Sequence, residues 1–230
     1  MSTALAIFVK TPGLSPIKTR LAATIGTADA EQFHTLAATA VAQVAFDEMP
    51  EIHAYWAIAE AAGMDHVQWQ QLPRIWQGDG GLGARLHRVC SQLLAAHDRV
   101  LLVGADAPQL SVALLRRAVA ALADPATPFV LGRADDGGFW LFGTRAPVPI
   151  EVWGTPRYSM QETASELMDA LSPHGAIAQL PVLNDLDDAG DAHAVIAALL
   201  ALPAALPAQR ALSDWLQTRF IRAGSKPLRA

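Results

Sequence analysis

Short apolar runs alternate with apolar stripes at helical spacing along most of the chain, and this alternation restricts the fold more than any other feature of the sequence. Runs of strand length are expected at residues 4–9, 52–58, 74–76, 100–103, 129–131, 139–142 and 177–180. Stripes of apolar residues three or four positions apart lie between most of them. Because parallel strands need a crossover, usually a helix, this order predicts an α/β fold with a mainly parallel central sheet flanked by helices.

The size and composition of the chain agree with one folded unit. It has 230 residues, of which 52% are hydrophobic and 17% are charged. These values are close to ordinary globular usage, and the length is sufficient for one domain with a sizeable core. We expect residues 1–222 to form a single domain and residues 223–230 a flexible carboxyl-terminal tail.

Charge and cysteine content exclude several classes of protein. The formal net charge of -5 argues against a nucleic-acid binder, which needs a broad cationic face, but it allows a small phosphorylated ligand. Cys90 is the only cysteine, so an internal disulfide and a multi-thiolate metal site are excluded. Its position on a helical stripe of apolar residues predicts a core residue. A single cysteine also suits a reducing compartment.

No signal peptide or membrane-spanning segment is expected. The amino end has only a short apolar stretch before Lys10 and lacks a charged leader. The longest uncharged stretch, residues 192–209, is interrupted by Pro203 and Pro207. We therefore expect a cytoplasmic protein without membrane insertion.

A cationic loop follows the first predicted strand. Lys10, Lys18 and Arg20 lie within eleven residues of one another, directly after the apolar run 4–9. Open α/β sheets bind ligands at the carboxyl ends of their strands, so these cations are candidates for binding phosphate. The loop is neither a Walker A motif, because Ile17 stands where that motif needs glycine, nor a dinucleotide fingerprint. The alternative interpretation is a solvated surface loop.

Acidic residues follow other predicted strands. Asp106 comes just after the run 100–103, in the pattern Gly-x-Asp-x-Pro, where a carboxylate can reach Mg²⁺ or Mn²⁺ or can simply turn the chain. Asp136 has the same ambiguity in Asp-Asp-Gly-Gly. Asp185 and Asp187 alternate across one leucine, so in an extended segment both carboxylates face the same way and can complete a metal site.

Other catalytic arrangements have little support in the sequence. The seven histidines are scattered, and none is assigned as a metal ligand. There is no Gly-x-Ser-x-Gly elbow, and Cys90 has no evident activating partner.

Three helix starts are predicted from capping residues. Ser111 is expected to cap a helix that begins just after it. Asp29 with Gln32, and Ser159 with Glu162, have the spacing of capping boxes.

Taken together, the ordered motifs resemble the glycosyltransferase-A-like family of radical-SAM/selenodomain-associated transferases. The motifs are Phe8-Val9-Lys10-Thr11-Pro12, Lys18-Thr19-Arg20-Leu21, Leu82-Gly83-x-Arg85, Gly104-x-Asp106-x-Pro108, Asp136-Gly137-Gly138-Phe139, Trp153-Gly154-Thr155 and Asp185-x-Asp187. The likeness covers residues 4–200. It differs from the family pattern at two positions: Ser15 replaces a glycine of the loop, and Gly104 replaces the first aspartate of an Asp-x-Asp pair.

This resemblance implies a nucleotide-diphospho-sugar transferase fold, related also to small-molecule guanylyltransferases, and it assigns a role to each matching residue. Asp106 and Asp187 are implied as ligands of Mg²⁺ or Mn²⁺, and Asp106 and Asp136 as catalytic residues. The implied binding residues for the donor and for the acceptor side are Lys10, Pro12, Lys18, Thr19, Arg20, Gly83, Arg85, Gly137 and Gly138.

Three functional hypotheses follow from the residues and the resemblance. The first is metal-dependent transfer from a nucleotide-diphospho-sugar to an unknown acceptor, with Asp135 or Asp136 as general base. The second is a nucleotidyltransferase acting on a small phosphorylated or sugar substrate. The third is a non-catalytic nucleotide-binding protein. The sequence does not identify the base, the sugar or the oligomeric state.

Overall fold

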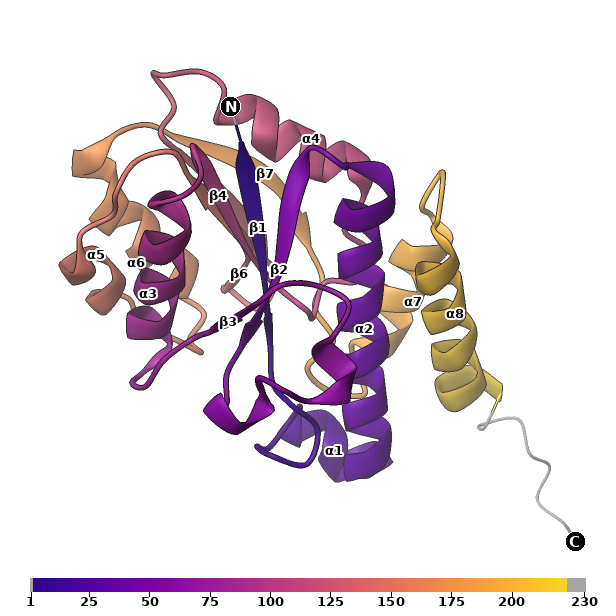
Figure 1. Cartoon of the computed structure of the whole chain (residues 1–230). Coiled ribbons are helices and arrows are strands. Elements are labelled where there is room, and N and C mark those ends of the chain that lie inside the picture. Colours follow the sequence, from indigo (N-terminus) through magenta and orange to yellow (C-terminus); the bar gives the residue numbers. More distant parts are fainter. Residues whose placement is uncertain (1, 223–230) are drawn as a thin grey trace, which may run out of the picture.

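Seven strands form one sheet in the computed structural model, which describes residues 2–222 (Figure 1). The strands are β1 (Thr3–Val9), β2 (Ile52–Ile58), β3 (Arg74–Trp76), β4 (Arg99–Gly104), β5 (Phe129–Ala134), β6 (Phe139–Thr144) and β7 (Ile177–Leu183). Their order across the sheet is β3-β2-β1-β4-β6-β5-β7, and β6 alone runs antiparallel to its neighbours. The predicted α/β class with a mainly parallel sheet is confirmed.

Helices cover both faces of this sheet. They are α1 (Thr19–Ile25), α2 (Thr27–Glu48), α3 (Leu82–Leu94), α4 (Val112–Ala121), α5 (Ile150–Gly154), α6 (Thr163–Leu171), α7 (Ala192–Leu200) and α8 (Pro207–Leu216), with short 3₁₀ turns at 61–63, 67–69 and 172–174 and a π-helical end at Gln217–Arg222. Helices α3, α5 and α6 lie on one face and α2 and α4 on the other, while α7 and α8 pack outside α2 (Figure 1).

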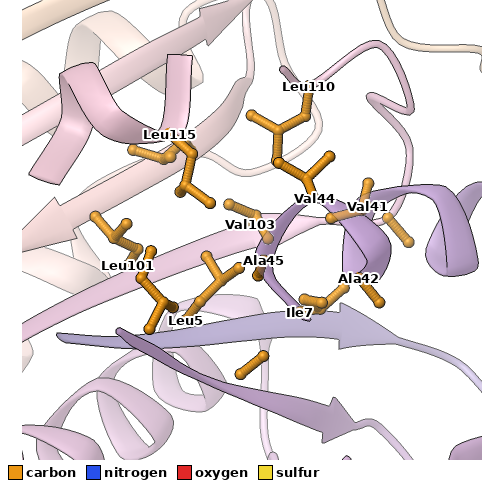
Figure 2. Packing of buried hydrophobic residues seen from close by; sticks show 14 of the residues in the cluster. Leu5, Ile7, Val41, Ala42, Val44, Ala45, Leu101, Val103, Leu110 and Leu115 are labelled. Carbon is orange, nitrogen blue, oxygen red and sulfur yellow. The ribbon is translucent and has the colours of Figure 1, made fainter. Parts of the chain in front are cut away.

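The alternation of side chains along β1 produces two apolar layers. Leu5 and Ile7 point to the face covered by α2 and α4, whereas Ala4 and Ala6 point to the face covered by α3, α5 and α6. Figure 2 shows Leu5 and Ile7 together with Leu101 and Val103 of β4, packed against side chains of α2 and the α4 region. Each fully buried Leu or Ile of this kind contributes about 1.5–3 kcal/mol through loss of apolar surface from water.

Three further expectations concern Cys90, membrane-spanning helices and the carboxyl-terminal tail. Cys90 lies on the buried face of α3, and burial raises the pKa of its thiol to about 12, as expected of an inert core residue. No helix between residues 2 and 222 is both long and apolar enough to cross a membrane. The expected tail, 223–230, lies outside the described residues.

One of the three capping predictions is confirmed and two are wrong. Ser111 Oγ accepts a hydrogen bond from the backbone N–H of Leu114 at 3.2 Å, at the start of α4. Helix α2 begins at Thr27 after Gly26, so Asp29 is already inside its first turn. Helix α6 begins at Thr163, and it is the Thr163 hydroxyl that accepts from Met160 N, while Ser159 adopts a left-handed conformation. Residues that match a capping box occur inside turns as readily as at helix ends, because both need a local side-chain acceptor.

Candidate functional site

The carboxyl ends of four parallel strands meet at one edge of the sheet, and each is followed by a charged residue. Lys10 follows β1, Asp106 lies two residues beyond β4, Asp136 two beyond β5 and Asp185 two beyond β7. These residues line a cleft of about 730 Å³, which is the position expected for ligand binding in an open α/β sheet.

The loop between β1 and α1 is held by side chains from neighbouring elements. Glu60 Oε2 accepts a hydrogen bond from Thr11 N at 2.8 Å, and the other oxygen of the same carboxylate accepts from the Ser15 hydroxyl. Glu31 Oε1 accepts from Gly13 N at 2.9 Å. These carboxylates take up backbone donors of the loop, so its shape is set before any ligand arrives. Ser15, the departure from the family pattern, belongs to this anchoring and is not among the residues that line the cleft.

Lys18 occupies the centre of the cleft. It precedes α1 in a left-handed conformation with φ of 45°, which is uncommon for a residue with a side chain. Its side chain is only 6% exposed, and Nζ lies 2.9 Å from Asp106 Oδ2 and 2.6 Å from Asp187 Oδ1. One ammonium therefore bridges the two carboxylates that the sequence assigned to a metal.

The pKa values of Lys18 and Asp106 shift toward their charged forms. Burial by itself lowers the pKa of Lys18, but the two aspartates outweigh this and raise it above the ordinary value. Burial likewise raises the pKa of Asp106, but Lys18, with His34, outweighs it and holds that pKa well below its usual range. Both groups are charged across the physiological pH range.

The other predicted cations are arranged around this pair. The Arg20 guanidinium contacts Asp187 Oδ2, so both oxygens of Asp187 contact a cation. Lys10 Nζ donates to the carbonyl of Pro16 at 3.0 Å, and Arg85 Nε donates to the carbonyl of Gly80 at 2.9 Å. All four cations and Thr19 line the cleft, so positive charge faces the ligand space.

A second group of carboxylates lines the same cleft. Asp136, Asp185 and Asp187 each offer an oxygen within 4.8 Å of the others. Burial and the charges of Asp136 and Asp187 raise the pKa of Asp185 to about 7. Clustered carboxylate oxygens are the ligands that Mg²⁺ and Mn²⁺ prefer, and a cation among them would relieve their repulsion. The donor set therefore fits a hard divalent cation, with Asp185 as a member that the implied pair Asp106 and Asp187 does not include.

Asp106 has one oxygen available for such a role. Its Oδ1 is buried and has no hydrogen-bond partner among residues 2–222, while Nδ1 of His34 lies 3.9 Å away. Nε2 of His34 accepts from Lys10 N at 3.2 Å, so in the neutral imidazole the proton is on Nδ1, facing Asp106. His34 is a site residue that the sequence did not reveal; its only signal is its place on the buried stripe of α2.

Three of the implied site residues lie outside the residues that line the cleft. Pro12 is in the anchored part of the loop. Gly83 packs under α5, where a Cβ would collide with the carbonyl oxygen of Trp153. Gly137 has φ of 91° in the β5–β6 turn, where a Cβ would meet the Gln161 backbone. Gly138 does line the cleft, and its N–H donates to Asp136 Oδ1 at 2.7 Å.

Aromatic residues near the site have mainly structural roles. Trp56 and Trp153 are fully buried in the two apolar layers. The Tyr158 hydroxyl, which lines the cleft, donates to the carbonyl of Trp153 at 2.9 Å.

Comparison with solved structures finds several with a similar fold. A "putative nucleotide-diphospho-sugar transferase" from Desulfovibrio desulfuricans G20 matches with a TM-score of 0.81 and 22% identity, over 96% of this chain and 99% of that one. CMP:2-keto-3-deoxy-manno-octonic acid synthetase complexed with CTP matches with a TM-score of 0.54 and 13% identity, over 85% of this chain and 97% of that one. 4-Diphosphocytidyl-2C-methyl-D-erythritol synthase from Anaerococcus prevotii DSM 20548 matches with a TM-score of 0.53 and 10% identity, over 94% of this chain and 96% of that one. The chain thus has the nucleotide-diphospho-sugar transferase fold.

Sequence comparison assigns the family. The family model described as "Uncharacterized protein conserved in bacteria (DUF2064)" matches residues 34–160, and the chain belongs to this family. No curated protein matches it in sequence.

Proposed function

We propose that this protein is a metal-dependent transferase that takes a nucleotide-diphospho-sugar as donor and passes the sugar to an acceptor. The observation that carries the proposal is the arrangement of the cleft, in which a buried lysine and a triad of carboxylates face the same space. A diphosphate needs cations on its oxygens, and a divalent ion bound to it needs carboxylates.

The donor phosphates would lie against the cationic side of the cleft. Lys10, Lys18 and Arg20 supply charge there, and Arg85 approaches from the start of α3. Their charge would stabilise the negative charge that develops on the leaving diphosphate. Asp136, Asp185 and Asp187, with the unpartnered Oδ1 of Asp106, would hold a Mg²⁺ or Mn²⁺ ion, which when bound supplies Lewis-acid stabilisation of that diphosphate.

The acceptor would enter beside Gly138, which lines the cleft at the β5–β6 turn. Asp136 lies at this turn, and one of its oxygens is fixed by Gly138 N. If the metal ion binds through this same oxygen, Oδ1, the other oxygen is left to take the proton of an acceptor hydroxyl, which is the general-base role. Asp135, the other candidate base, already accepts from the Asn184 side chain.

A nucleotidyltransferase is the second candidate, favoured by the fold shared with the two cytidylyl-transferring enzymes above. It would use the same cleft with a nucleoside triphosphate and release pyrophosphate. The two candidates differ in product, so the phosphorus-containing products distinguish them.

Product analysis tests the proposal. The purified protein is incubated with panels of diphospho-sugars and nucleoside triphosphates, each with and without Mn²⁺, and products are followed by ³¹P NMR and mass spectrometry. Metal-dependent release of a nucleoside diphosphate supports sugar transfer, and release of pyrophosphate supports the second candidate. Nucleotide binding without turnover across the panel would instead indicate a non-catalytic nucleotide-binding protein.

A pair of variants at the two ends of β4 ties the activity to the cleft. Asp106→Asn should abolish metal-dependent turnover while the fold is retained. Asp98→Asn is the matched control, because Asp98 precedes the amino end of β4, is exposed, and accepts from Ser2 N. Unchanged turnover in Asp106→Asn would contradict the assignment.

A further inference from the structure

Lys18 holds the position of a cation between two carboxylates of the cleft. Its ammonium is within 2.9 Å of Asp106 Oδ2 and 2.6 Å of Asp187 Oδ1, and its side chain is almost fully buried. The opposite oxygen of Asp187 contacts Arg20. A divalent cation and these two side chains therefore compete for the same oxygens of Asp187.

The same cations are those that face the ligand space. Lys18 and Arg20 line the cleft, and no acidic residue other than Asp106 and Asp187 has an ion pair with them among residues 2–222. A diphosphate bound there offers oxygens to Lys18 and Arg20, and a divalent cation offers positive charge to the aspartates. Binding of the diphosphate therefore favours binding of the divalent cation, and the reverse also holds, because neither the lysine and arginine nor the aspartates are left unpaired after the exchange.

The backbone is suited to such an exchange. Lys18 stands in a left-handed conformation at the start of α1, after a loop whose backbone is held by Glu60. The exchange therefore needs only rotation of its side chain, whose four-carbon stem and point charge accept new oxygen partners in many directions.

We infer that Lys18 is a built-in substitute for the divalent cation, which keeps Asp106 and Asp187 paired in the empty site and is displaced onto the donor's diphosphate when the metal ion binds. This inference rests on the proposed function, because it assumes that the cleft binds a diphosphate and a metal ion. It predicts an order of events: the metal ion alone binds weakly, and diphosphate and metal ion bind with positive cooperativity.

The first test measures metal affinity without any nucleotide. Mn²⁺ is titrated into the wild-type protein, Lys18→Met and Lys10→Met, and free Mn²⁺ is followed by electron paramagnetic resonance. Lys18→Met should bind Mn²⁺ about tenfold more tightly than wild type, since it removes a unit charge that contacts the ligands. Lys10→Met is the matched control, because the Lys10 ammonium contacts the Pro16 carbonyl and forms no ion pair with a carboxylate among residues 2–222, and it should bind Mn²⁺ as wild type does. Equal or weaker Mn²⁺ binding by Lys18→Met would overturn the inference.

The second test follows the lysine itself in the unmodified chain. A buried ammonium in an ion pair exchanges slowly with water, so its nitrogen is visible by NMR in protein labelled with ¹⁵N-lysine. Inorganic pyrophosphate with Mg²⁺ should shift this resonance, and pyrophosphate alone should shift it less. An unchanged resonance on saturation with both would overturn the inference. If Lys18→Met does not fold, Lys18→Gln replaces it, because its amide can still donate to one carboxylate.

The two proposals fail in different ways. If Lys18→Met gains Mn²⁺ affinity but no donor is turned over, the substitute role of Lys18 stands and the transferase proposal fails. If a donor is turned over but Lys18→Met shows no gain, the transferase proposal stands and the substitute role fails.

Discussion

The two halves of the cleft contain the same kind of side chain in opposite electrostatic states. On the β1 and β4 side, Asp106 faces the Lys18 ammonium, and its pKa lies well below the usual range. On the β5 and β7 side, Asp185 faces Asp136 and Asp187, and its pKa is raised to about 7. Lys18 and Arg20 pair Asp106 and Asp187 from within the chain, whereas among residues 2–222 neither Asp136 nor Asp185 has an ion pair with a cationic side chain.

This difference shows how one edge of a sheet can contain both carboxylates that are paired within the protein and carboxylates that are left for a ligand. Buried charges are costly unless they are paired, and Lys18 pairs those deepest in the cleft. The unpaired carboxylates are retained at some cost in stability, which is typical of a site whose partner arrives as a ligand.

The largest effect is expected when the β1 and β4 side loses its cation. Lys18→Met leaves Asp106 facing only His34 and should lower the free energy of unfolding by about 2–3 kcal/mol, toward the low end for buried pairs because Asp106 is partly open to solvent. Urea unfolding measures this. The control Lys10→Met removes a cation of the same loop and should change stability by less than about 0.5 kcal/mol. Equal effects in the two variants would mean that the two halves do not differ as described.

A smaller effect is expected when the β5 and β7 side loses a ligand. Asp185→Asn should weaken Mn²⁺ binding in the absence of nucleotide by about tenfold to a hundredfold, as expected for loss of one charged ligand in a small donor set. Calorimetric titration measures it. Asp188→Asn is the matched control, because Asp188 Oδ1 instead accepts from Gly190 N within its own turn. Retained Mn²⁺ affinity in Asp185→Asn would remove that residue from the metal site.

The same substitution should have the opposite effect on the metal-free protein. Because the folded state raises the pKa of Asp185, it keeps a proton that the unfolded chain loses, so stability falls as pH rises from about 4 to about 7. Asp185→Asn removes this penalty and should stabilise the protein by about 1–3 kcal/mol near pH 8 and by almost nothing below about pH 4. Thermal unfolding in a chelator across this pH range tests the sign. A variant less stable than wild type at pH 8 would be the contrary result.

The smallest effect is expected outside both halves of the cleft, in the hydrogen bonds that hold the loop between β1 and α1. Ser15→Ala removes one hydrogen bond to Glu60, whose other oxygen still accepts from Thr11 N. The expected loss is about 1 kcal/mol of stability, with nucleotide affinity unchanged because Ser15 does not line the cleft. Thermal unfolding and nucleotide titration measure the two quantities. A marked change in nucleotide affinity would show that the loop sets the position of the phosphates.

The sequence was sufficient for the fold class and for the edge of the sheet at which the candidate charged residues meet. Strand-length runs such as 52–58 coincide with β2, because buried strands carry continuous apolar patterns, and the parallel order placed Lys10, Asp106, Asp136 and Asp187 at one edge.

The pairings within the site could not be predicted. The contact of Lys18 with Asp187 joins residues that are 169 positions apart, and the contact of His34 with Asp106 depends on how α2 lies against β4. Such contacts follow from three-dimensional packing rather than from local periodicity. Gly83 is a further residue whose role could not be predicted. A side chain there would collide with the Trp153 carbonyl, so the glycine is required by packing between α3 and α5.

The most direct test of the account is an anomalous diffraction experiment on crystals of this protein grown with Mn²⁺ and a nucleoside diphosphate. The account predicts a manganese peak bounded by Asp136, Asp185 and Asp187, with the diphosphate bridging the metal ion and a Lys18 side chain that has left Asp187. A manganese peak elsewhere, or a diphosphate bound while Lys18 still joins Asp106 to Asp187, would contradict it.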